Sequence, residues 1–359
     1  METYGYWILL FVIVQAVLTG AQFAAARKPM KLPGRIVLIA VKALLAVAFA
    51  LLVMAGPTFL RPVQPLLTAI YAVLLPDAVA DLITLIAFRK GRRFAHLRLA
   101  SLVLGTVFFV YGTVNMQIVT PEYHTLASEK LTDSHRVVFV SDLHVGSSQS
   151  FDTTRRTIEK IGAEQPELVI LGGDITDDYT TKAEMEETYR LFGALGVPVY
   201  YIDGNHEIVQ HPEYSRIDYT YDELLGALEE NGITVLRDDF VEISDDVVLL
   251  GREDLADPAL RKTVAKPDTE RFFLVADHQP TSIREHVALG ADLQLSGHTH
   301  AVQFFPLKLL YPLFTPTYGE YAYDGTMLYV SAGASGWRLP FRTEAHCRFE
   351  VVDLVPAGA

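Results

Sequence analysis

Residues 137–144 read Val-Val-Phe-Val-Ser-Asp-Leu-His, and this stretch decides the fold of most of the chain. A β-branched run at 136–140 predicts a buried strand, and the side chains that follow it, Asp142 and His144, are common metal ligands. Four more short apolar runs also end in polar clusters. They are 168–171 before Gly-Gly-Asp174, 197–202 before Asp-Gly-Asn205-His206-Glu207, 272–275 before Ala-Asp-His278, and 293–295 before Ser-Gly-His298-Thr-His300.

Helical stretches are predicted between these strands, for example at 182–195 and 221–230. Strands that alternate with helices predict an α/β domain, and the polar clusters after the strands then meet along one edge of the sheet.

The clusters contain seven side chains that bind transition metals. Asp142 and His144 are two residues apart on a turn and can face one ion, whereas Asp174 follows two glycines and can bridge two ions. The seven candidate ligands are Asp142, His144, Asp174, Asn205, His278, His298 and His300. Such an N/O set suits two divalent transition ions (Mn, Fe, Zn or Co) and not Mg²⁺ or Ca²⁺ alone. Two ions about 3.5–4 Å apart clamp a phosphate and lower the pKa of a bridging water.

With these motifs, residues 136–353 resemble the calcineurin-like metallophosphoesterases, whose pattern is D-x-H, GD, GNH[DE], H and GHxH. The resemblance is greatest to a membrane-associated bacterial branch that includes the YkuE-like phosphoesterases. It implies an αββα sandwich in which two mixed sheets pack together with helices outside. Segments 318–321 and 329–333 are then expected to complete the second sheet.

The resemblance also implies roles for the site residues. One ion would be held by Asp142, His144, Asp174 and His300, and the other by Asp174, Asn205, His278 and His298. His206 would act near the leaving group as general acid or oxyanion stabiliser, with Glu207 orienting it. Many relatives have two glycines after GHxH, whereas this chain has Ala301 and Val302, which we expect to line the mouth of the site.

The first third of the chain has a different character, with four apolar stretches at 4–26, 36–55, 65–88 and 99–119. Each is long enough to span a bilayer as a helix. We therefore expect an all-α bundle of four transmembrane helices over 1–119, a polar connector over 120–134 and a metallophosphoesterase domain over 135–359. Ala24 to Ala26 resemble a signal-peptide cleavage site, but the preceding segment lacks basic residues, which favours a retained helix.

Basic residues predict the orientation of these spans. Arg27, Lys28, Lys31 and Arg35 lie between spans one and two, and Arg89, Lys90, Arg92 and Arg93 between spans three and four. The positive-inside rule places both loops in the cytoplasm, so we predict a multi-pass protein of the cell membrane with an extracytoplasmic catalytic domain.

Three charged residues lie within the predicted spans. Lys42 and Asp81 lie at matching depths, which predicts an ion pair between spans two and three. The alternative is that Lys42 reaches the nearby interface alone. Asp77 has no obvious partner in the sequence.

The charge of the two parts excludes some partners and leaves others. Residues 1–119 contain eleven Lys/Arg and three Asp/Glu. The remaining residues contain nineteen Lys/Arg and forty Asp/Glu. An acidic catalytic part would repel polyphosphate, so nucleic acid is not expected as a partner. The single Cys347 excludes an intrachain disulfide framework. Histidines assigned to packing or surface positions are His96, His124, His135, His211, His286 and His346.

The apolar segment 304–314 begins four residues after His300. It either enters the bilayer interface, guiding a phospholipid or lipid-linked phosphate to the metals, or packs on the domain's own core. Residues 211–223, with Tyr214, Tyr219 and Tyr221, are a candidate cap. The favoured function is a membrane-anchored dinuclear-metal phosphoesterase with the bilayer and a phosphoester as partners. The alternative is an inactive or regulatory membrane protein, a transporter or sensor, that retains the metal-binding domain.

Overall fold

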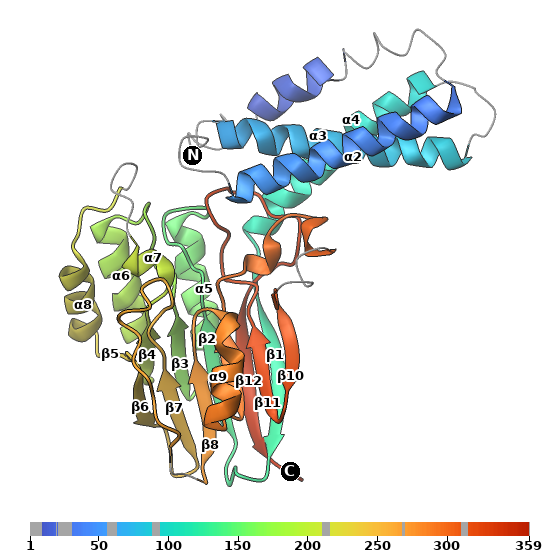
Figure 1. Cartoon of the computed structure of the whole chain (residues 1–359). Coiled ribbons are helices and arrows are strands. Elements are labelled where there is room, and N and C mark those ends of the chain that lie inside the picture. The colour runs from blue at the N-terminus through green and yellow to red at the C-terminus, as the bar shows by residue number, and fades with distance from the viewer. Residues whose placement is uncertain are drawn as a thin grey trace. The chain divides into compact units, whose positions relative to one another are not determined.

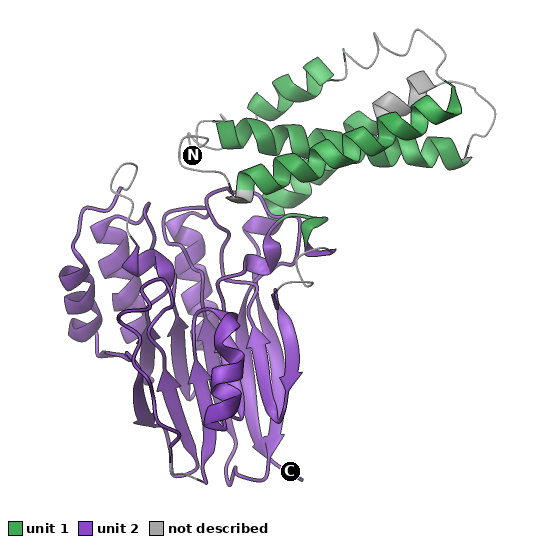
Figure 2. Ribbon diagram, in the orientation of Figure 1, with its two compact units in different colours: residues 1–114, 304–307 green, residues 115–303, 308–359 purple. Residues whose placement is uncertain are grey.

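The computed structural model describes residues 9–18, 20, 31–55, 63–87, 94–209, 216–267, 270–309 and 315–358. The chain divides into two compact units (Figure 2). The first comprises Met1–Val114 with Phe304–Leu307, and the second comprises Asn115–Gln303 with Lys308–Ala359.

The first unit is helical, with α2 (Leu32–Ala55), α3 (Gln64–Ala87), most of α4 (Phe94–Met116) and a helix over Leu9–Leu18. By length and composition, Leu32–Val53 and Gln64–Ile86 can each cross a membrane. Leu44 and Ile86 are 68% and 70% exposed. Apolar side chains this open are typical of helices that face lipid. Two of the four predicted spans are thus long and apolar enough to cross a membrane. The apolar helices Leu9–Leu18 and Ser101–Met116 are shorter. The two spans predicted there stay predictions.

A charged contact joins α2 to α3, as the matching depths of Lys42 and Asp81 predict. Lys42 Nζ lies 2.6 Å from Asp81 Oδ2, and both side chains are nearly buried. Lys42 therefore pairs with an acid and does not reach the interface alone. The expectation that Asp77 lacks a partner is wrong, because its carboxylate lies 3.8 Å from the same Nζ. Asp77 and Asp81 are four residues apart, which places both on one face of α3.

The second unit contains two six-stranded mixed sheets (Figure 1). The first sheet has the order β1-β12-β2-β3-β4-β5 and the second β10-β11-β9-β8-β7-β6. The first sheet's strands are β1 (Val119–Ser128), β2 (His135–Val140), β3 (Leu168–Gly172), β4 (Val199–Ile202), β5 (Ile233–Val235) and β12 (Cys347–Pro356). Those of the second are β6 (Asp239–Glu242), β7 (Val247–Gly251), β8 (Phe272–Ala276), β9 (Leu293–Ser296), β10 (Gly319–Tyr323) and β11 (Thr326–Val330).

Alternate residues of the central strands face opposite layers. On β2, Val137 and Phe139 belong to the core between the two sheets, whereas Val138 and Val140 face the helices outside the first sheet. Both faces are therefore apolar, as is usual for strands covered on both sides. The helices over the first sheet are α5 (Phe151–Ala163), α6 (Lys182–Gly193) and α8 (Tyr221–Glu230). Helix α9 (Ile283–Leu289) covers the outer face of β10 and β11, so the expected sandwich of helices, two mixed sheets and helix is present.

Helix boundaries follow local signals. Helices α6 and α8 begin with capping boxes, Thr181 with Glu184 and Thr220 with Glu223. Each threonine side chain accepts a hydrogen bond from the backbone N–H of the residue three positions later. That N–H has no partner within the helix, so the cap satisfies it. The remaining short elements are α7 (Asn205–Ile208), η2 (Pro280–Ser282), η3 (His300–Val302) and η4 (Leu307–Leu309).

The segment 120–134, expected to be a polar connector, contains most of a strand. Residues Val119–Ser128 form β1, which pairs in parallel with β12 along its whole length. As an edge strand, β1 buries only a few of its ten residues. A strand at the edge of a sheet can therefore be polar, and its sequence reads like a linker.

Candidate metal centre

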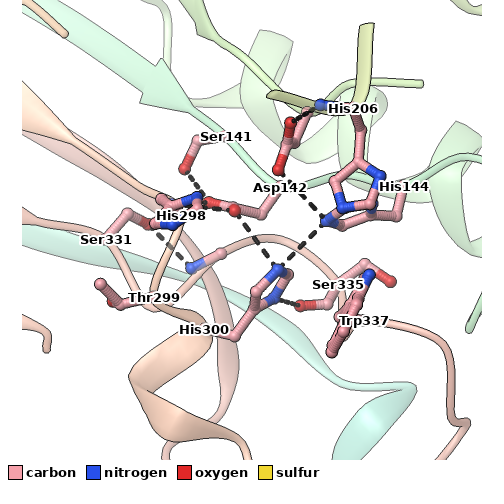
Figure 3. A network of polar contacts seen from close by, with 12 residues as sticks. Ser141, Asp142, His144, His206, His298, Thr299, His300, Ser331, Ser335 and Trp337 are labelled. Atoms are coloured by element: carbon pink, nitrogen blue, oxygen red, sulfur yellow. Dashed lines mark hydrogen bonds and ion pairs between the residues drawn. The ribbon is translucent and has the colours of Figure 1, made fainter. Parts of the chain in front are cut away.

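The candidate ligands lie just past the carboxyl ends of strands from both sheets. Asp142 and His144 follow β2, and Asp174 follows β3. Asn205 begins α7 after β4, while His278 follows β8, and His298 and His300 follow β9. Figure 3 shows several of these side chains converging from separate elements.

The structure brings the predicted side chains together. The potential ligand atoms of Asp142, His144 and His300 lie within 4.8 Å of one another, and so do those of Asp174, His278 and His298. These are three members of each ligand set that the family pattern implies. A third group, His144, Asp174 and His206, connects the two.

Five of these residues have left-handed backbone conformations. The φ angles are +54° for Asp142, +42° for His144, +52° for Asp174, +71° for His298 and +49° for His300. Such angles are costly for residues with a Cβ and concentrate at functional sites. Neighbouring loops hold the backbone there: the Asp142 N–H donates to Gly173 O at 3.0 Å and the His144 N–H to Asp174 O at 3.1 Å.

Two glycines of the motifs are required by close approach. A Cβ on Gly204 would lie 2.3 Å from Asp174 Oδ1, and one on Gly297 would lie 2.3 Å from Asp142 Oδ2. Any larger residue would push a carboxylate out of the cluster, which explains the glycines of GNH and GHxH.

The imidazole rings are held by their outer nitrogens. His144 Nδ1 lies 3.2 Å from Asp177 Oδ2. His278 Nδ1 lies 2.8 Å from Gly172 O, and His300 Nδ1 lies 3.3 Å from Ser335 O. Each Nε2 therefore faces the cluster, and a second ring contact of this kind is typical of histidines that bind metals.

The inward atoms fit divalent cations. His144 Nε2 and His300 Nε2 face each other at 3.1 Å (Figure 3). Asn205 Oδ1 and His298 Nδ1 are buried without a hydrogen-bond partner in the described structure, and His278 Nε2 lies 3.1 Å from Asp174 Oδ2. Buried acceptors of this kind are costly unless something satisfies them. All three belong to the ligand set implied for one ion, so the side chains present suit that cation.

Electrostatics agree with this fit. Burial lowers the pKa of His300 to about 3 and that of His298 to about 4, so both rings are in the neutral form that binds metal. Burial also acts on His144, but Asp177, Asp174 and Asp142 outweigh it and raise its pKa to about 9. A cation at this position would take the place of that proton.

Glu207 contacts the backbone of the ligand-bearing loops, and the implied roles of His206 and Glu207 stay predictions. The Glu207 carboxylate accepts from the backbone N–H groups of Asp174, Thr176 and Gly204, each at 2.9 Å. It thereby ties two ligand-bearing loops together. His206 is half-buried, its backbone N–H donates to Asp174 Oδ1 at 2.9 Å, and its ring centroid lies 5.0 Å from that of His144.

Ala301 and Val302 do not line an open mouth. Both are buried and follow His300 in the short helix η3. The candidate cap is only partly described: Tyr214 lies outside the described residues, Tyr219 is buried in the core against the helices, and the Tyr221 hydroxyl donates to Asp203 at 2.6 Å.

Four of the histidines assigned to packing or surface positions have described side chains, and none of these joins a candidate metal group. His124, His135 and His286 are buried against polar partners, and His346 Nδ1 lies 2.5 Å from Asn115 Oδ1. The His96 side chain and His211 lie outside the described residues.

Sequence reasoning missed the residues that support the ligands, chiefly Asp177, Gln303 and Arg342. Asp177 could have been suspected because it follows Asp174 by three residues on the same loop. Gln303 and Arg342 carry no local signal. Arg342 is fully buried and donates to Ser335 O at 2.9 Å and to His300 O at 3.0 Å.

A two-sheet sandwich with clustered carboxylates and imidazoles at its strand ends defines an α/β domain with a candidate metal-binding site. Residues 135–302 match the model of the calcineurin-like phosphoesterase family. The chain therefore carries a calcineurin-like metallophosphoesterase domain, as its motifs predict.

Three relatives illustrate the similarity. An uncharacterized metallophosphoesterase of Helicobacter pylori is 30% identical over 240 residues, which cover 64% of this chain and 62% of the relative. A transmembrane protein with metallophosphoesterase domain from Danio rerio is 28% identical over 277 residues, which cover 71% of this chain and 61% of the relative. The uncharacterized metallophosphoesterase YkuE of Bacillus subtilis is 26% identical over 284 residues, which cover 74% of this chain and 96% of the relative. The match thus spans less than two thirds of the first two relatives.

Proposed function

We propose that this chain is a membrane-anchored phosphoesterase that hydrolyses a phosphate ester by attack of water at a centre of two divalent metal ions. The observation that carries this proposal is the pair of adjacent ligand groups, with Asp174 in reach of both and buried acceptor atoms turned inward. When bound, two divalent ions supply positive charge that polarises the phosphoryl group and lowers the pKa of the attacking water.

The protein's own residues position this chemistry. Asp142, His144, Asp174 and His300 would hold one ion, and Asp174, Asn205, His278 and His298 the other. Asp177 orients the His144 ring, and Glu207 holds the two loops in register. His206 lies on the half-exposed side, where its ring can protonate or hydrogen-bond the leaving-group oxygen.

The proposal is tested with the full-length protein in detergent micelles. We expect about two transition ions per chain, and hydrolysis of p-nitrophenyl phosphate or bis-p-nitrophenyl phosphate. Asp174→Asn should lower turnover by about a hundredfold or more, because it weakens the one carboxylate shared by both ligand sets. Asp245→Asn, at an exposed turn, is the matched control. Metal binding without turnover of either ester would contradict the proposed reaction.

The proposed setting is a multi-pass membrane protein with four spans, cytoplasmic basic loops and an extracytoplasmic catalytic domain. It is supported by two helices long enough to span, by their exposed apolar faces and by relatives named as transmembrane proteins. Most of the basic loop residues lie outside the described residues.

The proposed substrate class is a phospholipid or lipid-linked phosphate. Residues Phe304–Leu307, directly after Gln303, belong to the helical unit, where Phe304 packs edge-on against Tyr71 and the Tyr71 hydroxyl donates to Phe305 O. Thus the first residues of the apolar segment join the helices and not the core of the second unit. Leu310 to Phe314 lie outside the described residues.

Leu309 tests the lipid substrate, because its side chain lies in this segment and is 70% exposed. Leu309→Ser should lower hydrolysis of phospholipid in vesicles while leaving the nitrophenyl esters unaffected, since only the lipid needs an apolar guide. Leu260→Ser, in a different exposed loop, is the control and should change neither rate. Equal losses on both substrates would contradict the lipid assignment.

A further inference from the structure

Two ligands implied for the same ion follow buried carboxylates. Asp203 lies two residues before Asn205, and Asp277 lies directly before His278. Both carboxylates are buried. The three ligands implied for the other ion alone each follow an uncharged residue, namely Ser141, Leu143 or Thr299. A buried carboxylate is costly unless it is paired, so the contacts that hold Asp203 and Asp277 also fix the turns that carry the two ligands.

Arg237 pairs with Asp203. Its Nε donates to Asp203 Oδ2 at 3.3 Å, and its Nη2 donates to the hydroxyl of Tyr221, which in turn donates to Asp203 Oδ2 at 2.6 Å. The Tyr201 hydroxyl donates to the other carboxylate oxygen at 3.1 Å. Donors from β4, from α8 and from the segment after β5 therefore hold this carboxylate, and the turn toward Asn205 starts from a fixed point.

Arg261 pairs with Asp277 through both carboxylate oxygens. Its Nη2 donates to Asp277 Oδ2 at 2.8 Å and its Nη1 to Oδ1 at 3.3 Å. The Arg261 side chain is 7% exposed, and that of Asp277 is fully buried. On the other side of His278, Gln279 Nε2 donates to Asp254 Oδ1 at 2.9 Å. The loop after β7 therefore holds the residue before the ligand and the residue after it.

Glu253 connects the two arginines. Arg261 Nη1 donates to the Glu253 carbonyl at 2.8 Å, and the Glu253 carboxylate lies 3.9 Å from Arg237 Nε. Glu253 is itself buried. Five charged residues thus form one contiguous chain from the Asn205 turn to the His278 turn. We call this chain the arginine network, and its members are Asp203, Arg237, Glu253, Arg261 and Asp277.

We infer that Arg237 and Arg261 are positioning residues for one of the two ions, the ion whose implied ligands include Asn205 and His278. This inference rests on the proposed two-ion phosphoesterase centre. Without either arginine, a buried carboxylate loses its partner, and the turn beside it shifts to expose that carboxylate to water. Asn205 or His278 then leaves the place that its ion requires, whereas the other ion keeps ligands that are held from outside the network.

Two effects of the arginines oppose each other. Each guanidinium is a cation close to a cation site, so its removal would tighten metal binding if its field at the ion were the larger effect. Each guanidinium also contacts a carboxylate, however, and the paired charges cancel most of that field. Loss of a contact that supports a metal ligand weakens binding by about 10–100-fold, so we expect the positioning effect to be the larger one.

The test counts the Mn²⁺ ions bound to the full-length protein in detergent micelles by equilibrium dialysis. Electron paramagnetic resonance distinguishes a coupled pair of ions from a single ion. Arg237→Gln and Arg261→Gln should each weaken the binding of one ion by about 10–100-fold and leave the other ion bound, as in Asn205→Ala and not as in His300→Ala. Arg237→Lys and Arg261→Lys keep the charge and should recover part of the loss.

The matched control is Arg190→Gln on α6. Arg190 contacts both carboxylate oxygens of Glu187 at 2.7 Å, but its side chain is 57% exposed. The same arginine–carboxylate contact is therefore removed at the surface, and Mn²⁺ binding should equal that of the wild type.

The outcomes separate this inference from the proposed reaction. If the wild type binds two ions but hydrolyses neither nitrophenyl ester, the reaction fails, and loss of one ion in the glutamine variants still supports the positioning role. Glutamine variants that bind both ions as tightly as the wild type, or more tightly, would overturn that role. Loss of both ions together, or a wild type that binds no pair of ions, would overturn it as well.

Discussion

At the scale of single residues, the centre depends on side chains that never face a substrate. Asp177 is buried, accepts the Tyr179 N–H at 2.8 Å and contacts His144 Nδ1 at 3.2 Å. The carboxylate selects the tautomer in which His144 Nε2 carries a lone pair toward the cluster.

Asp177→Asn should therefore weaken metal binding by about 10–100-fold while the fold is retained. Equilibrium dialysis against a divalent transition metal measures this loss, and Asp245→Asn is a control that removes a carboxylate from an exposed turn. An affinity equal to that of the wild type would mean that the backbone contact of His144 with Asp174 is enough to orient the ring.

At the scale of elements, α2 and α3 are joined by one cation and two acids within a largely apolar contact. Lys42 Nζ lies 2.6 Å from Asp81 and 3.8 Å from Asp77. Removing the cation leaves two carboxylates facing each other in a low dielectric, which is more costly than removing the whole cluster.

Lys42→Met should thus destabilise the helical unit by about 3–5 kcal/mol. Lys42→Met combined with Asp77→Leu and Asp81→Leu should recover much of that loss, because no buried charge is then unpaired. Thermal unfolding in detergent measures both, with Lys31→Met at an exposed position as control. A single variant as stable as the wild type would show that water reaches the pair.

At the scale of the whole second unit, His124 joins the two sheets. From β1 it contacts Glu350 on β12 at 2.8 Å and Glu320 on β10 at 2.7 Å. Burial lowers the pKa of His124, but the hydrogen bonds to Glu350 and Glu320 outweigh burial and raise it above its ordinary 6.5. A folded pKa above the unfolded one means that the stabilisation is complete below about pH 6.5 and is lost as pH rises through the folded pKa.

His124→Gln should therefore lower the unfolding midpoint more at about pH 6 than at about pH 9. The control Thr125→Val, at the next and exposed position of β1, should have an effect that does not change with pH. A His124→Gln effect that is constant across this range would show that the histidine acts by packing alone.

Much of the architecture was predictable because its signals are local. Five apolar runs, each followed by a polar cluster, predict strands whose carboxyl ends meet at one edge, and the structure gathers those side chains there. The capped helix at 221–230 has the predicted bounds. The edge strand β1 was not predictable, because its polar residues become a strand only by pairing with β12.

The sequence alone thus determined the α/β class, the ligand types and the pairing of Lys42 with Asp81, since period, spacing and composition carry this information. Only the tertiary structure decided that Glu207 ties loops together, that Asp77 shares Lys42, that Ala301 and Val302 are buried, and that Gln303 clamps Trp337 to the metal-binding turn. These depend on distances between segments far apart in the chain, which packing of the two sheets and the helices sets and no local pattern encodes.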